Sequence, residues 1–134
     1  MRNKVLILVR GLPGSGKSTT AQKVYRDYVH FETDEYFMQD GKYRFKSYEL
    51  GKAHAWCQWL VATAMRNGAN ITVSNTFTQM WEMAVYHMLA QAYEYEVEVL
   101  DLYDCGLTDM QLAQRNKHGV PVEKIQEMRA RWEK

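Results

Sequence analysis

Apolar segments alternate with amphipathic stretches along the chain. Residues 5–9 are aliphatic without alternation, which is typical of a strand buried on both faces of a parallel sheet. Shorter apolar segments at 29–33 and 71–73 predict two more strands. Residues 95–102 alternate glutamate with apolar side chains, which predicts an edge strand with one face in water.

The segments between these strands have helical periodicity. They predict helices over about 17–28 and 50–67, and a helix capped by Thr78. Thr108 and Gln111 have the spacing of a capping box and predict a short helix to about Asn116, and Pro121 suits the first turn of a last helix. Residues 38–47 favour irregular structure. Alternating strands and helices predict a parallel α/β sheet with right-handed crossovers.

Composition narrows the classes of protein. The chain has 134 residues, 46% hydrophobic and 25% charged, which predicts one globular domain over 1–134. A net charge of +1 excludes a global basic footprint, so a nucleic-acid partner would need a local patch. No apolar run is long enough to span a bilayer, and we expect no membrane partner. The only two cysteines, Cys57 and Cys105, lie far apart and predict free thiols in a reducing, cytoplasmic compartment. Oligomeric state stays open.

Topology alone locates a candidate site. In parallel α/β sheets ligands bind at the carboxyl ends of the strands. This rule selects residues near 11–18, 34, 74–76 and 103–108 before any motif is considered.

Residues 11–18 match the phosphate-binding pattern G-x-x-x-x-G-K-[ST]. Glycines let successive amides turn toward phosphate oxygens, and the following helix offers its positive end. Lys17 can reach the β- and γ-phosphates, and the Ser18 hydroxyl can bind Mg²⁺. The alternative is a glycine-rich turn with a solvated lysine. The candidate nucleotide-binding residues here are Gly14, Ser15, Gly16, Lys17, Ser18 and Thr19.

Asp34 follows the second predicted strand, on the side that would face the γ-phosphate. A carboxylate there can accept the proton of an incoming hydroxyl group, as a kinase base does. Glu35 is the reserve candidate. The competing interpretation is that Asp34 caps the next turn.

A basic segment joins the last two predicted helices. An arginine here can contact a transferring phosphoryl group from a mobile lid, and Arg115 fits this role, with Lys117 as the next choice. The alternative is a solvated basic helix end. His118 precedes Gly119 and is interpreted as a turn residue.

Residues 42–46, followed by Tyr48, interleave basic and aromatic side chains next to the proposed base. Such a pattern suits an RNA or DNA acceptor, with Arg44 as a candidate substrate-binding residue. The competing interpretation is a solvated loop whose rings partly enter the core.

Together these motifs resemble the small P-loop kinase-like ATP-binding proteins related to the polynucleotide 5′-hydroxyl kinase module. The motifs that carry the resemblance occur in order at 11–19, 33–37, 53–57, 75–78 with 81–83, and 115–121. The resemblance implies a three-layer α/β P-loop NTPase fold with a parallel sheet of about four strands and a C-terminal lid. It also implies transfer of the ATP γ-phosphate, with Mg²⁺, to a 5′-hydroxyl of RNA or DNA.

Carried over by position, the resemblance assigns a role to each matching residue. Lys17, Ser18 and Thr19 would hold ATP and Mg²⁺. Catalysis would involve Lys17, Asp34 as base and Arg115 on the lid. The resemblance also implies that Asn75 and Thr76 face the acceptor.

Two positions depart from the phage-type polynucleotide kinases. Phe37 stands where those enzymes have an acceptor-binding arginine, and Ser74 and Asn75 stand where they have an aspartate after strand three. A metal-binding acid of the Walker-B type is therefore not evident. A kinase for a nucleoside or other small metabolite, and a non-catalytic ATP-binding module, stay open as alternatives.

Overall fold

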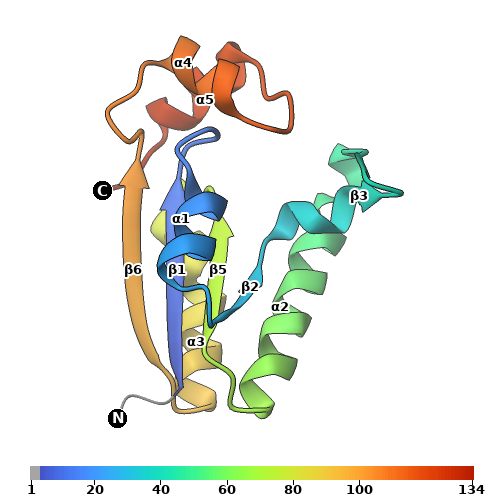
Figure 1. The fold of residues 1–134 in the computed structure, drawn as a ribbon, viewed down its shortest axis with the longest axis vertical. Coiled ribbons are helices and arrows are strands. Elements are labelled where there is room, and N and C mark those ends of the chain that lie inside the picture. Colours follow the sequence, from blue (N-terminus) through green and yellow to red (C-terminus); the bar gives the residue numbers. More distant parts are fainter. Residues whose placement is uncertain (1–3) are drawn as a thin grey trace.

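The computed structural model describes residues 4–134 and contains a parallel four-stranded sheet in the order β2-β5-β1-β6 (Figure 1). The strands are β1 (Val5–Gly11), β2 (Val29–Phe31), β5 (Ile71–Asn75) and β6 (Glu96–Tyr103). The predicted parallel sheet is confirmed. The strand with alternating glutamates, β6, lies at an edge of the sheet, as its pattern predicted.

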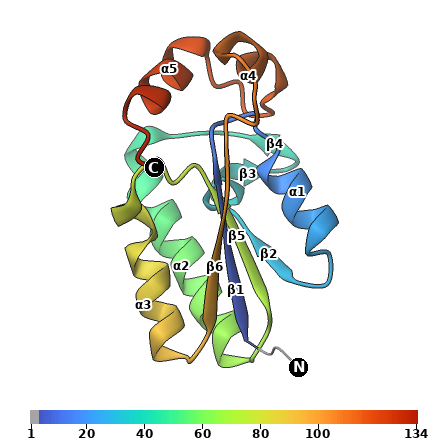
Figure 2. The ribbon, with the colours of Figure 1, turned by 90° about the vertical axis from the view of Figure 1, so that its left-hand side faces the viewer.

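Helices cover both faces of the sheet, so the fold has three layers (Figure 2). One face carries α1 (Lys17–Val24), and the other carries α2 (Leu50–Arg66) and α3 (Ala84–Ala92). Beyond the carboxyl ends of the strands lie α4 (Asp109–Arg115) and α5 (Val122–Ala130) (Figure 1). This pair occupies the place predicted for a C-terminal lid. Within residues 4–134, no helix combines the length and hydropathy needed to cross a bilayer.

Strand β1 is buried along its whole length because both of its faces meet a helical layer. Leu6 and Leu8 join the core on the α2 and α3 side. Val5, Ile7 and Val9 join a second core cluster with Ala21 of α1. This explains why the sequence of the strand shows no alternation.

Helix α1 ends at Val24, earlier than the predicted end near residue 28. The rings of Tyr25 and Tyr28 lie 5.2 Å apart and pack against the core cluster on the α1 side. Burying both rings bends the chain away from the helical path and delivers it to β2.

The predicted cap at Thr78 is wrong, because Gln79 is the N-cap residue. A 3₁₀ helix, η3 (Met80–Met83), comes before α3, and Glu82 accepts a hydrogen bond from the Gln79 amide at 3.0 Å. Thr78 instead donates its hydroxyl hydrogen to Glu82 at 2.7 Å. Threonine is the more usual N-cap residue, but here its hydroxyl is hydrogen-bonded to Glu82 and the helix begins one residue later than predicted.

The segment predicted as irregular contains short regular pieces. Residues 38–43 form a hairpin of β3 (Met38–Gln39) and β4 (Lys42–Tyr43), and η2 (Ser47–Glu49) begins at the end of this segment. Another 3₁₀ helix, η1 (Thr33–Phe37), precedes it, so β2 ends at Phe31 rather than at the predicted residue 33. Asp40 and Gly41 form the turn of this hairpin, both with positive φ.

Candidate functional site

The loop that joins β1 to α1 is fixed by backbone hydrogen bonds to the neighbouring strand ends. The Gly11 amide donates to Thr76 O at 3.3 Å, and the Leu12 amide donates to Tyr103 O at 2.8 Å. The Ser15 amide then donates to Leu12 O at 3.0 Å, which curls the loop back on itself. The curled loop ends at Gly16, the N-cap of α1, so it leads directly into the helix N-terminus as the motif predicted.

Glycine is required at this loop for two separate reasons. Gly14 and Gly16 have φ of 84° and 94°, in the left-handed region that favours glycine. A side chain at Gly11 would place its Cβ 2.4 Å from Ser15 Oγ, and one at Gly14 would place it 2.4 Å from Leu112 O of α4. The phosphate loop is therefore packed directly against the lid.

Lys17 folds back over the loop and donates a hydrogen bond from Nζ to Leu12 O at 3.2 Å. Burial lowers the pKa of Lys17 from 10.5 to about 8, although Glu32 and Asp34 favour its charge. The ammonium group is thus desolvated in advance and poised for an anionic ligand. Thr19, predicted to bind nucleotide, is exposed on the first turn of α1.

Ser18, the predicted metal ligand, donates a hydrogen bond from its hydroxyl to Glu32, which follows β2. Burial opposes ionisation of Glu32, but hydrogen bonds from His30 and Ser18 and the charge of Lys17 outweigh it and lower the pKa of the carboxyl. Glu32 is therefore an ionised carboxylate beside the phosphate loop. The sequence gives no direct signal for Glu32, because the acid of the resembling kinases stands at the end of β5.

Glu32 lies in a group of three side chains that could bind a metal ion. The ligand atoms of His30, Glu32 and Glu35 all lie within 4.8 Å of one another. His30 is oriented by Thr72, whose Oγ1 lies 2.8 Å from Nδ1. Among these groups Glu32 alone is bonded to the phosphate loop. A hydroxyl and a carboxylate oxygen are hard donors of the kind that Mg²⁺ prefers, so Ser18 and Glu32 fit that ion.

A cavity of about 200 Å³ opens next to this pair. Its walls combine the phosphate loop, α1, the segment after β2, β3 and the loop between α4 and α5, and its lining residues are Ser18, Gln22, Glu32, Asp34, Glu35, Met38, Lys117 and His118. The predicted base Asp34 and its reserve Glu35 are thus placed with the predicted metal ligand. The competing interpretation of Asp34 as a cap is wrong, because Asp34 lies inside η1, whose N-cap is Glu32. Its Oδ1 instead accepts a hydrogen bond from the Tyr43 hydroxyl at 3.1 Å.

The residues predicted to bind the acceptor are placed differently from one another. Asn75 Oδ1 accepts a hydrogen bond from the Thr33 amide at 2.9 Å, and so links β5 to the start of η1. Thr76 supplies the carbonyl that holds Gly11. Arg44 is exposed beyond the hairpin. None of Arg44, Asn75 and Thr76, all described residues, lines the cavity.

The lid places other side chains in the cavity than the one predicted. Arg115 is the last residue of α4 and is exposed, and it does not line the cavity as the structure describes it. Lys117 and His118 from the next loop do line it. His118 Nε2 lies 3.7 Å from Asp34 Oδ2, so the residue interpreted as a turn position faces the predicted base.

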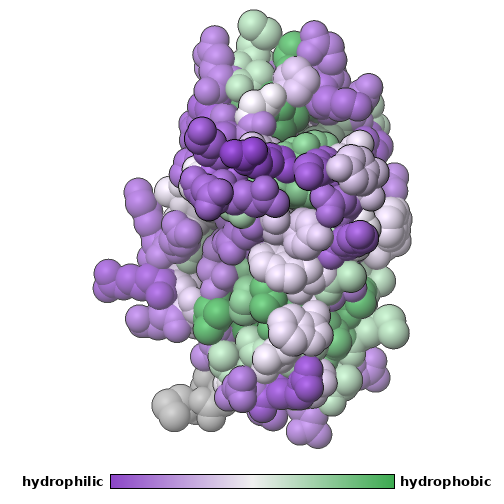
Figure 3. Space-filling model, turned by 90° about the vertical axis from the view of Figure 1, so that its right-hand side faces the viewer, coloured by the Kyte–Doolittle hydropathy of each residue, from purple (hydrophilic) through white to green (hydrophobic). Residues whose placement is uncertain are grey.

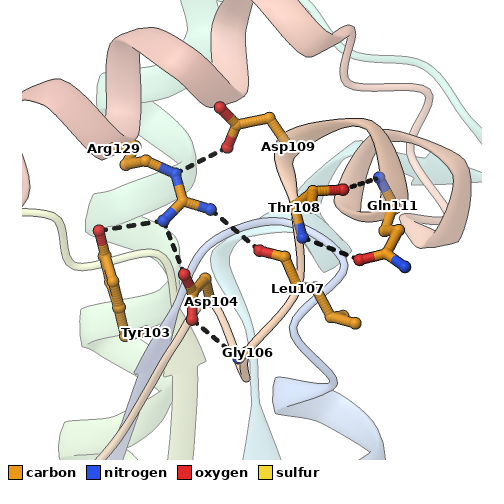
Figure 4. A network of polar contacts seen from close by, with 8 residues as sticks. All are labelled: Tyr103, Asp104, Gly106, Leu107, Thr108, Asp109, Gln111 and Arg129. Carbon is orange, nitrogen blue, oxygen red and sulfur yellow. Dashed lines mark hydrogen bonds and ion pairs between the residues drawn. The ribbon is translucent and has the colours of Figure 1, made fainter.

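The two lid helices are anchored to the rest of the fold. Leu12 of the phosphate loop forms a buried cluster with Leu112 and Ile125. Arg129 of α5 holds the segment that leads from β6 into α4 (Figure 4). It donates to Asp109 at 2.7 Å, to Asp104 at 2.6 Å, to the Tyr103 hydroxyl at 3.1 Å and to Leu107 O at 3.1 Å.

Comparisons with known proteins show the family of the chain. A family model described as an AAA domain matches residues 6–134. NEDD4-binding protein 2 of Homo sapiens is 40% identical over 129 residues, which is 92% of this chain and 7% of that protein. The chain therefore spans a small part of this curated relative.

Solved structures show the same fold. A chain of the Pnkp1/Rnl/Hen1 RNA repair complex is similar with a TM-score of 0.72 and 20% identity, over 98% of this chain and 45% of that one. A gluconokinase from Sinorhizobium meliloti 1021 is similar with a TM-score of 0.63 and 17% identity, over 100% of this chain and 78% of that one. The predicted resemblance is confirmed at the level of family and fold. The chain belongs to the AAA domain family and has the three-layer α/β fold of P-loop kinases.

Proposed function

We propose that this protein is an ATP- and Mg²⁺-dependent kinase that transfers the γ-phosphate of ATP to a hydroxyl group. One observation carries the proposal: Ser18 of the phosphate loop, the ionised Glu32 and the candidate base Asp34 line a single cavity. Similarity to a gluconokinase and to a chain of an RNA repair complex supports the same reaction class.

The nucleotide would be held by the phosphate loop. Backbone amides of the loop and of the first turn of α1 would donate to its phosphate oxygens, and the ammonium of Lys17 would exchange its hydrogen bond to Leu12 O for phosphate oxygens. Ser18 and Glu32 are the residues that would hold Mg²⁺. When bound there, the ion supplies positive charge that offsets charge on the phosphate oxygens.

Asp34 would accept the proton of the acceptor hydroxyl. The side chain is 48% exposed and faces the cavity, so an acceptor can reach it. Burial and the charge of Asp34 raise the pKa of Tyr43, which therefore stays protonated and keeps donating to Asp34. Lys117, and Arg115 after a rearrangement of the lid, would supply positive charge to the phosphoryl group.

A polynucleotide 5′-hydroxyl is the favoured acceptor. Lys42, Arg44, Phe45 and Lys46 are exposed around the hairpin, close to Asp34, which suits a phosphate backbone and a stacked base. Figure 3 shows the face with α2 and the hairpin, and its upper half, at the level of the hairpin and lid, is mostly hydrophilic.

One observation favours the second candidate, a nucleoside or small-metabolite kinase. Phe37, at the position where phage-type polynucleotide kinases carry an acceptor-binding arginine, is 2% exposed and packs against Phe45 and Tyr43. It cannot contact a phosphate of the acceptor. A cavity of about 200 Å³ also suits a small acceptor or a terminal nucleotide.

The test is transfer of ³²P from γ-labelled ATP to a panel of 5′-hydroxyl RNA, 5′-hydroxyl DNA, nucleosides and sugar acids. Wild-type protein should label at least one acceptor. Asp34→Asn should lower kcat by about 10²-fold or more, with the Kd for ATP within about threefold. Asp40→Asn is the matched control, because Asp40 is exposed in the hairpin turn with φ of 51°, which asparagine tolerates.

The outcomes separate the candidates. Labelling of oligonucleotides but not nucleosides supports the first, and the reverse supports the second. ATP binding without transfer to any acceptor would contradict the kinase proposal and favour a non-catalytic ATP-binding module. Full activity in Asp34→Asn would remove the base assignment alone.

A further inference from the structure

His118 lies where two segments distant in sequence meet over Asp34. Its imidazole ring stacks on the ring of Tyr43 in β4, with centroids 4.0 Å apart and planes inclined by 27°. The contact joins the loop between α4 and α5 to the β3–β4 hairpin. His118 is 32% exposed and also lines the cavity.

The stacked pair lies against both oxygens of the Asp34 carboxylate. Tyr43 donates its hydroxyl hydrogen to Oδ1 at 3.1 Å, and His118 Nε2 lies 3.7 Å from Oδ2. A carboxylate that is hydrogen-bonded through one oxygen and flanked by a ring nitrogen at the other has fewer orientations than one that is free in solvent. For a proton acceptor, orientation toward the incoming hydroxyl decides how often a reactive geometry forms.

The loop that carries His118 is shaped to present it. Asn116 donates from Nδ2 to Leu112 O at 3.2 Å, to Ala113 O at 3.0 Å and to Val120 O at 3.0 Å. Its Oδ1 accepts a hydrogen bond from the Val120 amide at 2.8 Å. These bonds tie the two ends of the loop together, so residues 117–119 project as a short tip. Gly119 completes the tip with φ of 69°.

We propose that His118 is a positioning residue for phosphoryl transfer: by stacking on Tyr43 it closes the lid loop over the acceptor cavity, and through Nε2 it orients Asp34 toward the acceptor hydroxyl. The inference rests on the proposed kinase function and assigns a role within that site. It also explains how anchored lid helices can still take part in catalysis, since the tip reaches the base directly.

Three substitutions separate the two parts of this role. His118→Phe keeps a ring for stacking and removes the nitrogen that faces Asp34. His118→Gln keeps a polar group and removes the ring. Tyr43→Phe keeps the stack and removes the hydroxyl that binds Asp34. His87→Phe is the matched control, because His87 is exposed on α3 and does not line the cavity as described.

Steady-state kinetics with the acceptor found for wild-type protein gives the main readout. We expect His118→Phe and Tyr43→Phe each to lower kcat about tenfold, with KM for ATP and for the acceptor within about threefold. His118→Gln should have a higher kcat than His118→Phe, because it keeps a polar group near Asp34. It should raise KM for the acceptor, because the loop no longer stacks on Tyr43. A kcat of His118→Phe equal to that of wild-type protein would overturn the proposal. The proposal would also be overturned if His87→Phe changed kcat and stability as much as His118→Phe does.

A second measurement does not depend on transfer activity. In the proton NMR spectrum, the imidazole signals of His118 are assigned as those that disappear in His118→Gln. In wild-type protein these signals should be shifted upfield by the Tyr43 ring, and in Tyr43→Leu they should return toward ordinary values. Imidazole signals unaffected by Tyr43→Leu would overturn the proposal. If wild-type protein phosphorylates nothing in the panel, the kinase proposal fails. The expected upfield shift would then show only that His118 holds the loop against the hairpin, and the positioning role would be overturned.

Discussion

We predict that nucleotide binding is coupled to protonation of Lys17. The apo protein buries this ammonium group, and its described hydrogen-bond acceptor is a single carbonyl, Leu12 O. Burial lowers its pKa from 10.5 to about 8. A triphosphate placed in the loop adds several negative charges beside Nζ, which favours the charged form and raises the pKa again.

The structure sets the size of the effect. With a pKa of about 8, Lys17 of the apo protein is about half protonated at pH 8 and about a tenth protonated at pH 9. If the bound nucleotide holds the pKa above 10, binding takes up about 0.1 proton at pH 7, about 0.5 at pH 8 and about 0.9 at pH 9. ATP itself is fully ionised above pH 8, so this rise belongs to the protein.

Isothermal titration calorimetry measures this uptake. The binding enthalpy of ATP with Mg²⁺ is compared at each pH in two buffers of different ionisation enthalpy, and the difference gives the number of protons taken up. Lys17→Arg is the control, because a guanidinium stays protonated and should show no such rise. Saturable binding without proton uptake at pH 8–9 would show that Lys17 is already charged in the apo protein and would refute the argument.

The same burial predicts a change in stability without nucleotide. Because the folded-state pKa is lower than the unfolded one, the charged lysine destabilises the fold below about pH 8, and stability rises from there to pH 10.5. At about 1.4 kcal/mol per pH unit, the full effect at pH 7 is about 3 kcal/mol. Lys17→Met should raise the free energy of unfolding by up to this amount and abolish stabilisation by ATP.

Two further predictions concern the metal and the lid. Glu32→Gln should weaken the apparent affinity for Mg²⁺ about tenfold and strengthen binding of ATP without Mg²⁺, because one negative charge is removed beside Ser18; calorimetry with and without the ion checks this. Gly14→Ala should destabilise the fold by at least about 1 kcal/mol more than Gly41→Ala in urea unfolding. Both glycines have positive φ, but a Cβ meets Leu112 O only at Gly14.

Local sequence patterns predicted the part of the candidate site that would bind the nucleotide, which is the phosphate loop with β1 and the start of α1. The aliphatic run of β1, the glycines at 14 and 16 and Lys17 follow one another in the chain, and each has a direct structural consequence. The proximity of Asp34 to Ser18 also followed from sequence, because parallel strands end at one edge of the sheet.

The other half depends on contacts between distant segments. His118 and Tyr43 stack across 75 positions, and no local signal marks either residue as a partner of Asp34. Glu32 was not predicted for a related reason: this acid beside Ser18 follows β2, whereas the end of β5, where an acid was expected, has Asn75, which accepts a hydrogen bond from the Thr33 amide.

The phosphate loop and the residues around Asp34 are stabilised by separate contacts, and this affects how acceptor specificity can change. The phosphate loop is held by backbone hydrogen bonds to the ends of β5 and β6, and Leu12 and Gly14 pack against α4, so few substitutions in the loop should preserve the fold. The acceptor half consists of a hairpin and a three-residue tip whose ends are tied by Asn116. Substitutions in the hairpin or in residues 117–119 can alter the cavity without disturbing the phosphate loop. Acceptor specificity should therefore be set at the contact between Tyr43 of the hairpin and His118 of the tip.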